Sequence, residues 1–112
     1  MRILVCCKQV DEPESLLLDE QGRPYPNAPA RRKLAEWDAR ALEEALVLKE
    51  TRPGVEVWAV TVGPAEADAV LQRALGMGAD QAAHILAADD PPLRPATIAA
   101  WLAEFARERG FD

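Results

Sequence analysis

The sequence contains no run of about 18 apolar residues, so no membrane-spanning helix is expected. It also lacks, at its start, the basic stretch, long apolar segment and small-residue cleavage site of a secretory signal. Basic residues are in the minority, 13 against 19 acidic residues, which gives a net charge of −6. An acidic surface repels nucleic-acid phosphates and anionic membranes, so neither is expected as a partner. These absences predict a cytoplasmic protein.

The motifs of phosphate binding and self-sufficient catalysis are missing as well. The chain has no G-x-G-x-x-G after its first apolar segment, no G-x-x-x-x-G-K-[ST], no nucleophile elbow and no H-E-x-x-H. The single histidine, His84, falls inside a predicted strand, where packing explains it better than catalysis or ligation. Asp89 and Asp90 lie in a proline-rich loop, where turn formation explains them better than metal binding. An enzyme that acts on its own is therefore not expected.

Cysteine is equally scarce: Cys6 and Cys7 are the only two, and they are adjacent. Neighbours on a strand point to opposite faces, so a disulfide between them is geometrically poor. No second pair exists to build a disulfide framework or a metal site. We interpret both as buried core thiols. A reactive or redox thiol is the open alternative, because the pair lies near the end of a predicted strand.

What is present is an ordinary soluble composition, with 49% apolar and 29% charged residues in 112. This length allows one domain with a real core. Apolar runs predict strands and a three-to-four spacing predicts helices. The predicted order is strand 3–7, helix 36–52, strand 55–62, a helix from Pro64 to Gly78, strand 81–86 and helix 96–109. Strands alternating with helices predict an α/β fold, a parallel sheet with flanking helices and right-handed crossovers.

Two segments depart from this alternation. Residues 11–29 hold four of the nine prolines and form a long excursion, which we interpret as a hairpin with its turn near residues 21–23. Its prolines make a return strand doubtful, because proline cannot donate to a ladder. The basic run at residues 31–33 favours a solvated loop, with contact to an anionic group or partner as the alternative. At the other end, residues 110–112 resemble the lead-in to a further strand, so the fold is expected to be incomplete at its C-terminus.

In open parallel sheets, ligands bind beyond the carboxyl ends of the strands, near a switch in winding direction. Residues 6–10, residues 60–64 and the loop from Ala87 are predicted to meet at that edge, with residues 35–38 closing the pocket. This geometry suits a mononucleotide, with backbone N–H groups at the Gly63 turn holding a phosphate or an adenine edge. Among the tryptophans, Trp58 and Trp101 fit core positions. Trp37 either packs in the core or stacks on an adenine.

Four segments, taken in order, resemble the N-terminal part of the beta subunit of electron transfer flavoprotein. Its typical patterns are K-I-L-V-C-V-K-Q-V, then N-P-Y-D-x-x-A-L-E-E-A-L, then V-x-x-G-P, then A-M-G-A-D. This chain has Ile3-Leu4-Val5-Cys6-Cys7-Lys8-Gln9-Val10, then Trp37-Asp38-Ala39-Arg40-Ala41-Leu42-Glu43-Glu44-Ala45-Leu46, then Val60-Thr61-Val62-Gly63-Pro64, then Leu75-Gly76-Met77-Gly78-Ala79-Asp80. Each piece is weakly specific, whereas the ordered set spans nearly the whole chain and is specific.

The resemblance implies a Rossmann-like, universal-stress-like adenine-nucleotide-binding domain over residues 1–112, truncated at its end. It implies AMP or FAD as the cofactor, an alpha subunit that carries FAD as the partner, and dehydrogenases as electron donors. Such a protein is an electron-transport subunit in a heterodimer, and not a self-sufficient enzyme. By position, the nucleotide-lining places fall on Cys6, Trp37, Asp38, Val62 and Gly63.

Two departures from the family pattern bear on the ligand. The Asn-Pro before the helix is Ala35-Glu36 here, which removes a polar amide and adds a negative charge. The family's glycine-rich phosphate loop would begin directly after Asp112, so weak nucleotide binding is expected of this chain alone. Two alternatives stay open: a small adenine-nucleotide-binding regulator of the universal-stress type, and a structural domain that has lost its ligand.

Overall fold

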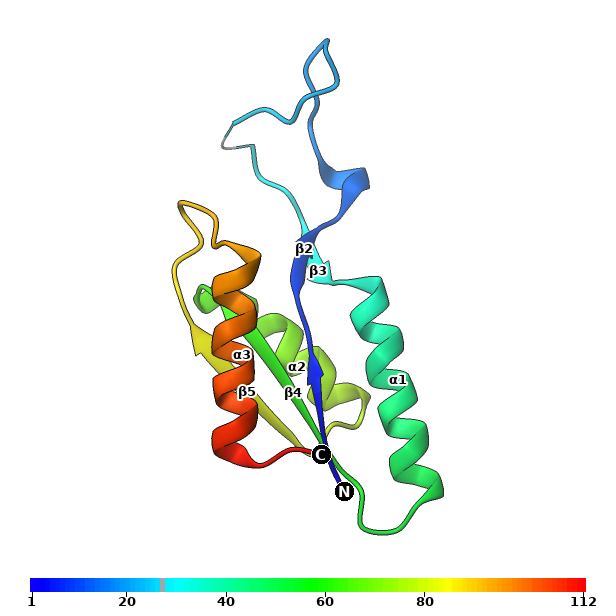
Figure 1. Cartoon of the computed structure of the whole chain (residues 1–112). Helices are drawn as coiled ribbons and strands as arrows, with labels where there is room; N and C mark the ends of the chain where they lie inside the picture. Colours follow the sequence, from blue (N-terminus) through cyan, green and yellow to red (C-terminus); the bar gives the residue numbers. More distant parts are fainter. Residues whose placement is uncertain (27) are drawn as a thin grey trace.

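A parallel three-stranded sheet forms the centre of the computed structural model, which describes residues 1–26 and 28–112. Its strands are β1 (Arg2–Cys6), β4 (Glu56–Gly63) and β5 (Gln81–Leu86), in the order β1-β4-β5 (Figure 1). The register pairs Val5 with Ala59 and Val60 with Ala83. β4 lies in the middle and is mostly buried, as expected for a continuous apolar run in a parallel sheet. The predicted α/β fold is confirmed.

Two helices cover one face of the sheet, α1 (Glu36–Thr51) and α2 (Asp68–Met77) (Figure 1). The core lies between them and the strands, and its buried members are Val5, Cys7, Leu42, Ala45, Leu46, Val57, Ala59, Val70, Leu71, Ala74 and Ala79. Leu75, also on α2, is 44% exposed. The buried residues of α2 are Val70, Leu71 and Ala74.

The connection from β4 to α2 also differs in detail from the prediction. Pro64 does not open the helix; it precedes a short 3-10 turn, η2 (Ala65–Ala67), and α2 begins only at Asp68. At the other end α2 stops at Gly78, whose φ of 130° is accessible to glycine and strained for other residues. The predicted end of this helix at Gly78 is confirmed.

The last helix, α3 (Pro95–Arg109), covers the opposite face of the sheet (Figure 1). Its apolar stripe is only half-buried; the members are Ile98, Trp101, Leu102 and Phe105. Gly110 ends the helix with a φ of 72°. The chain then reaches the free edge of β1, where the Asp112 N–H donates to the Arg2 carbonyl at 2.9 Å. The winding therefore reverses at β1, since β4 and β5 were added on its other side.

Between β1 and α1 the chain leaves the body of the protein as a long hairpin. Its base is a short antiparallel ladder between β2 (Gln9–Asp11) and β3 (Arg32–Leu34). Beyond the ladder lies the segment that we call the arm, residues 12–26 and 28–31, which begins with the 3-10 turn η1 (Pro13–Ser15). Figure 1 shows the arm projecting beyond the sheet and helices, in a molecule of 54 × 26 × 20 Å.

The prediction of a hairpin turn near residues 21–23 is confirmed, because the Asp19 and Arg23 backbones are hydrogen-bonded around Gly22. The prediction that the basic run lies in a solvated loop is wrong for Arg32 and Lys33, which are strand residues. Neither is a proline, so both can donate to the ladder, and the prolines that made a return strand doubtful all precede them. No helix in residues 1–26 or 28–112 is long and apolar enough to cross a membrane.

Candidate functional site

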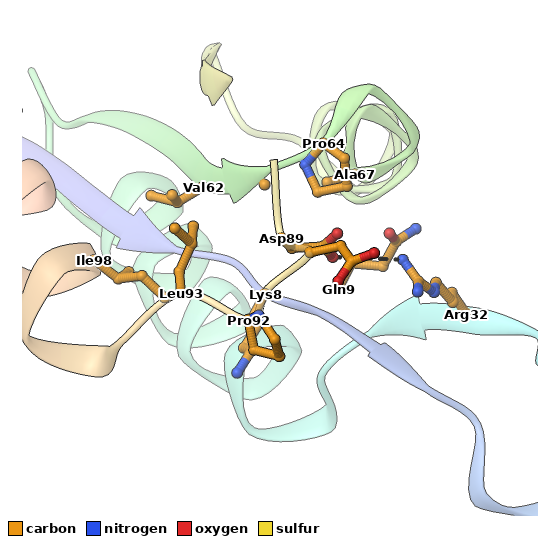
Figure 2. Close-up of a pocket in the computed structure, with 12 residues that line it drawn as sticks. Lys8, Gln9, Arg32, Val62, Pro64, Ala67, Asp89, Pro92, Leu93 and Ile98 are labelled. Atoms are coloured by element: carbon orange, nitrogen blue, oxygen red, sulfur yellow. Dashed lines mark ion pairs between the residues drawn. The ribbon is translucent and has the colours of Figure 1, made fainter. Parts of the chain in front are cut away.

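Two neighbouring cavities lie at the carboxyl ends of β1 and β4, where the winding reverses. The larger has a volume of about 470 Å³, within the usual range of ligand pockets, and the smaller about 260 Å³. The larger is lined by Lys8, Gln9, Arg32, Val62, Gly63, Pro64, Ala67, Asp89, Asp90, Pro92, Leu93 and Ile98 (Figure 2). The smaller is lined by Cys6, Cys7, Lys8, Asp38, Val60, Val62, Ile98 and Leu102. The three segments predicted to meet at this edge do meet there.

The larger cavity has apolar side chains on one side and polar ones on the other. Val62, Leu93 and Ile98 lie together at one end, and Gln9, Asp89 and Arg32 at the other (Figure 2). The Gln9 amide nitrogen donates to the Glu66 carbonyl at 3.2 Å. The Gln9 Oε1 atom is buried and has no hydrogen-bond partner among the described residues. A buried acceptor without a donor is costly, and this one belongs to a residue that lines the cavity.

The charges at the larger cavity nearly cancel. Arg32 Nε lies 3.2 Å from Asp11, and Arg32 Nη1 lies 4.0 Å from Asp89. Lys8 adds one positive charge and Asp90 one negative charge to the lining. This balance favours an uncharged, hydrogen-bonding ligand portion such as a base over a bare phosphate.

Asp38 has a defined structural task in the smaller cavity. Its Oδ2 atom accepts a hydrogen bond from the Lys8 backbone N–H at 2.8 Å. The Ala35 N–H donates to the Lys8 carbonyl at 2.9 Å, so the start of α1 and the end of β1 are bonded in both directions. Asp38 thereby fixes the backbone that leads from β1 into both cavities.

Four of the five site residues predicted from the sequence line these cavities. Cys6 and Asp38 line the smaller, Gly63 the larger, and Val62 both. Trp37 lines neither and is 80% exposed, with the Arg40 guanidinium 5.4 Å from its ring centroid. The interpretation of Trp37 as a core residue is therefore wrong, because it occupies the outward side of the first turn of α1. Its contact with a ligand remains a prediction.

The other two tryptophans lie in partly covered positions. Trp58 is half-buried and meets Phe111 edge-on, with ring centroids 5.6 Å apart. Its indole Nε1 donates to Glu56 at 2.7 Å. Trp101 is half-buried on α3, beside a shallow groove formed with β5.

The sequence model of the electron transfer flavoprotein domain matches residues 28–112, which is most of the chain. The chain belongs to the electron transfer flavoprotein domain family. Three relatives, each at least 33% identical, extend the match. One is the caffeyl-CoA reductase-Etf complex subunit CarD of Acetobacterium woodii, 43% identical over 82 residues, or 73% of this chain and 31% of that protein.

The other two relatives are beta subunits by name. The mitochondrial electron transfer flavoprotein subunit beta of Oryza sativa is 37% identical over 102 residues, 88% of this chain and 40% of that protein. The subunit beta of Bradyrhizobium diazoefficiens is 33% identical over 109 residues, 96% of this chain and 43% of that protein. The chain thus spans less than half the length of these curated relatives. The family resemblance given by the four sequence segments is confirmed.

Sequence reasoning did not assign Arg32 or Ile98 to the site of this electron transfer flavoprotein domain, and it placed Gln9 and Leu93 at the site only as parts of longer segments. Gln9 lies in the Lys8-Gln9-Val10 part of a quoted motif, and that signal could have identified it. Arg32 reaches the cavity only because the β2–β3 ladder brings it opposite Asp11. No local sequence pattern predicts such a strand pairing, because it joins residues far apart in the chain.

The two thiols of the domain differ in their surroundings. Cys7 is buried in the core, whereas Cys6 is exposed, so the interpretation of both as core thiols is wrong for Cys6. Alternation on the strand turns Cys7 toward α1 and Cys6 toward the more open α3 side. Partial desolvation and then the Asp38 carboxylate raise the pKa of Cys6. The same two causes, followed by the neighbouring Cys6, raise the pKa of Cys7 to about 12.

We expect one thiol to react with Ellman's reagent in the folded protein at pH 8 and two after denaturation. The thiolate is the nucleophile, so raised pKa values slow both reactions and make the rate increase with pH. Cys6→Ser should abolish the native reaction and Cys7→Ser should leave it. Equal rates for both thiols in the folded protein would contradict the assignment.

Proposed function

We propose that this chain is the nucleotide-binding scaffold of an electron transfer flavoprotein beta subunit. In this role residues 1–112 act as one domain that holds AMP or FAD and pairs with an alpha subunit carrying FAD. The assembly shuttles electrons from dehydrogenases in the cytoplasm and is not a self-sufficient enzyme. The observation that carries the proposal is the match to proteins named beta subunit over as much as 96% of the chain. The cavities at the winding reversal support it independently.

The residues of the larger cavity fit the adenine end of such a cofactor. An apolar wall of Val62, Leu93 and Ile98 can face the adenine ring, and a turn of the Gln9 side chain would bring its unpartnered, buried Oε1 atom to the exocyclic amine. The near-neutral lining gives the phosphates little attraction, which agrees with the expectation that the chain alone binds nucleotide weakly. When FAD is bound it supplies the electron-transfer chemistry, while these residues bind and orient it.

The test is to purify the natural protein from its host together with whatever accompanies it, denature it and separate the released nucleotides by chromatography. FAD together with AMP, or two FAD per heterodimer, is the expected result and distinguishes AMP from FAD at this site. ATP or AMP with no flavin would favour the regulator of the universal-stress type. Complete absence of nucleotide would leave a structural domain and contradict the site.

A matched pair of variants ties the nucleotide to these cavities. Val62→Phe places a larger side chain in both and is expected to reduce the retained nucleotide about tenfold or more, the size of effect that follows from losing about 1.4 kcal/mol of binding. Leu86→Phe enlarges an exposed side chain on β5 and should leave retention unchanged. Circular dichroism on both variants separates lost binding from lost folding.

A further inference from the structure

β5 is an open edge of the sheet. Within residues 1–26 and 28–112 it pairs with β4 alone, since the strand order is β1-β4-β5. The Asp80 N–H points toward β4, where it donates to the Val57 carbonyl at 2.8 Å. Backbone groups alternate sides along a strand, so those of Ala83 and Ile85 turn away from β4. The edge therefore offers free N–H and carbonyl groups to another strand.

The sequence of β5 does not protect this edge. Its six residues, Gln-Ala-Ala-His-Ile-Leu, include no lysine, arginine, aspartate, glutamate or proline. Charged side chains and prolines are common means by which edge strands avoid pairing with other chains. Leu86, at the carboxyl end of the strand, is 71% exposed. A strand of this composition is suited to pairing with a further strand.

A shallow groove of about 400 Å³ lies beside this edge, between β5 and α3. The α3 residues that line it recur at three and four positions and so share one face of the helix; they are Trp101, Glu104, Phe105 and Glu108. β5 contributes Ile85 and Leu86. The groove has no lining residue in common with the two cavities at the winding reversal, so it is a separate surface.

The groove is acidic and aromatic. Glu104 and Glu108 are exposed, and neither forms an ion pair with a described residue. The Arg109 guanidinium lies 5.7 Å from the Phe105 ring centroid, whereas no described cation lies over the Trp101 ring. Carboxylates beside an open aromatic face attract lysine and arginine through ion pairing and cation–π contact. The groove therefore complements a basic partner.

The spacing of the two carboxylates suits a strand. Glu104 and Glu108 are four residues apart on α3, about 6 Å along the helix. Alternate side chains of a strand are about 6.6 Å apart and point to the same face. A strand with basic residues at alternate positions thus presents one cation to each glutamate. A second copy of the chain does not, because its β5 carries no charged residue and its groove adds two more carboxylates.

We propose that β5 and the groove beside it bind an extended basic segment of another protein, which adds a strand to the open edge of the sheet. The backbone of this segment pairs with Ala83 and Ile85. Its alternate lysine or arginine side chains pair with Glu104 and Glu108, and one of them lies on the Trp101 ring. Because the groove is separate from the cavities, segment binding and nucleotide retention are independent measurements.

The probe is a short, capped peptide of alternating lysine and threonine, titrated at low salt into the isotope-labelled protein and followed by NMR. The Ala83 and Ile85 amides are expected to gain protection from hydrogen exchange. The Ala82 and His84 amides point toward β4 and should change little. Ala83→Pro removes one outward N–H and should abolish strand addition, whereas the ladder with β4 remains, as circular dichroism can verify.

A charge-matched pair of variants tests the groove. Glu104→Gln with Glu108→Gln is expected to raise the peptide dissociation constant about tenfold, about threefold for each lost ion pair at an exposed site. The control, Glu43→Gln with Glu50→Gln, removes two exposed carboxylates from α1 on the opposite face of the sheet and should leave the constant unchanged. A peptide with the same lysines in one block should bind more weakly.

Other results overturn the proposal. Equal binding of the two peptides, unchanged affinity in the Glu104 and Glu108 variant, or no binding by the wild type would show that the groove does not select an alternating basic segment. Peptide binding without protection of the Ala83 and Ile85 amides would mean attraction by charge alone. If the free protein sediments as a dimer in which these amides are already protected, the occupant is a second copy of the chain.

Discussion

Leu42→Ala is expected to lower the free energy of unfolding by about 2–5 kcal/mol, the range for a buried leucine truncated in a core. Leu42 lies on α1 with an exposed fraction of 0%, among the core residues beneath the sheet. It is four residues beyond Asp38, on the same helix that anchors the end of β1. The cavity left behind loosens this packing, so nucleotide retention should fall together with stability.

Urea unfolding followed by circular dichroism measures the change. The matched control is Val47→Ala on the same helix, where the side chain is 49% exposed and the expected change is within about 0.5 kcal/mol. A loss below about 1 kcal/mol for Leu42→Ala would show that the helix is not held by this contact.

Asp80→Ala has the second-largest expected effect, a loss of about 2–3 kcal/mol, because one carboxylate serves two partners. Asp80 Oδ2 accepts the Val57 N–H at 2.9 Å, and Oδ1 accepts from Lys49 Nζ at 2.7 Å. Lys49 also donates to the Gly78 carbonyl at 2.9 Å, which fastens α1 to the turn after α2. Without Asp80, the N–H of the buried Val57 loses its acceptor.

Asp80→Asn separates the two contributions. The amide oxygen can still accept from Val57, whereas the ion pair with Lys49 is lost, so we expect only about 1 kcal/mol at a pair whose side chains are each one-third exposed. Glu44→Ala, on the exposed side of α1, is the control and should change little. If Asp80→Ala and Asp80→Asn were equally destabilising, the hydrogen bond from the Val57 N–H would contribute nothing to the free energy of unfolding.

The stability that Asp80 provides depends on pH in a direction set by the shift of its pKa. The Lys49 hydrogen bond and then the Val57 N–H hold the pKa of Asp80 below its ordinary value. The stabilisation is therefore present above the unfolded-state pKa of about 3.9 and is lost as the pH falls through the lower folded-state value. The stability difference between wild type and Asp80→Asn should persist at pH 7 and shrink below about pH 4. Urea unfolding at several pH values tests this, and a constant difference down to pH 2 would contradict it.

The secondary structure was largely predictable because its signals are local. The strand at residues 81–86 and the bounds of α1 and α3 agree with the prediction to within a residue or two. Apolar periodicity, glycine stops and the Pro53-Gly54 break each act over one or two helical turns, and such signals are complete within the sequence. Their order alone predicted the parallel sheet, because the helix between two strands carries the chain back to the end of the sheet from which the first strand started.

The candidate site was predictable in position and less so in composition. The strand-end rule predicted that residues 6–10 and 60–64 meet at one edge, and both cavities lie there. Cys6, Asp38, Val62 and Gly63 came from the family resemblance; all four line the cavities, and their contact with a ligand stays a prediction. The rule does not say which way a residue in the first turn of a helix points, so Trp37 was a candidate for the core although it faces solvent. It also does not reveal that Asp38 is bonded to the Lys8 backbone, since that bond joins residues 30 positions apart.

By itself, the sequence determined the order of the three parallel strands and three helices, the bounds of most of them, and the family to which the chain belongs. Only the tertiary structure decided that Cys6 is exposed while Cys7 is buried, that Arg32 bridges Asp11 and Asp89, and that the Gln9 Oε1 atom is buried without a hydrogen-bond partner. The physical reason is the distance along the chain over which each kind of interaction acts. Backbone preferences and periodicity act between near neighbours, whereas burial, ion pairing and hydrogen-bond satisfaction depend on residues that meet only when the chain has folded.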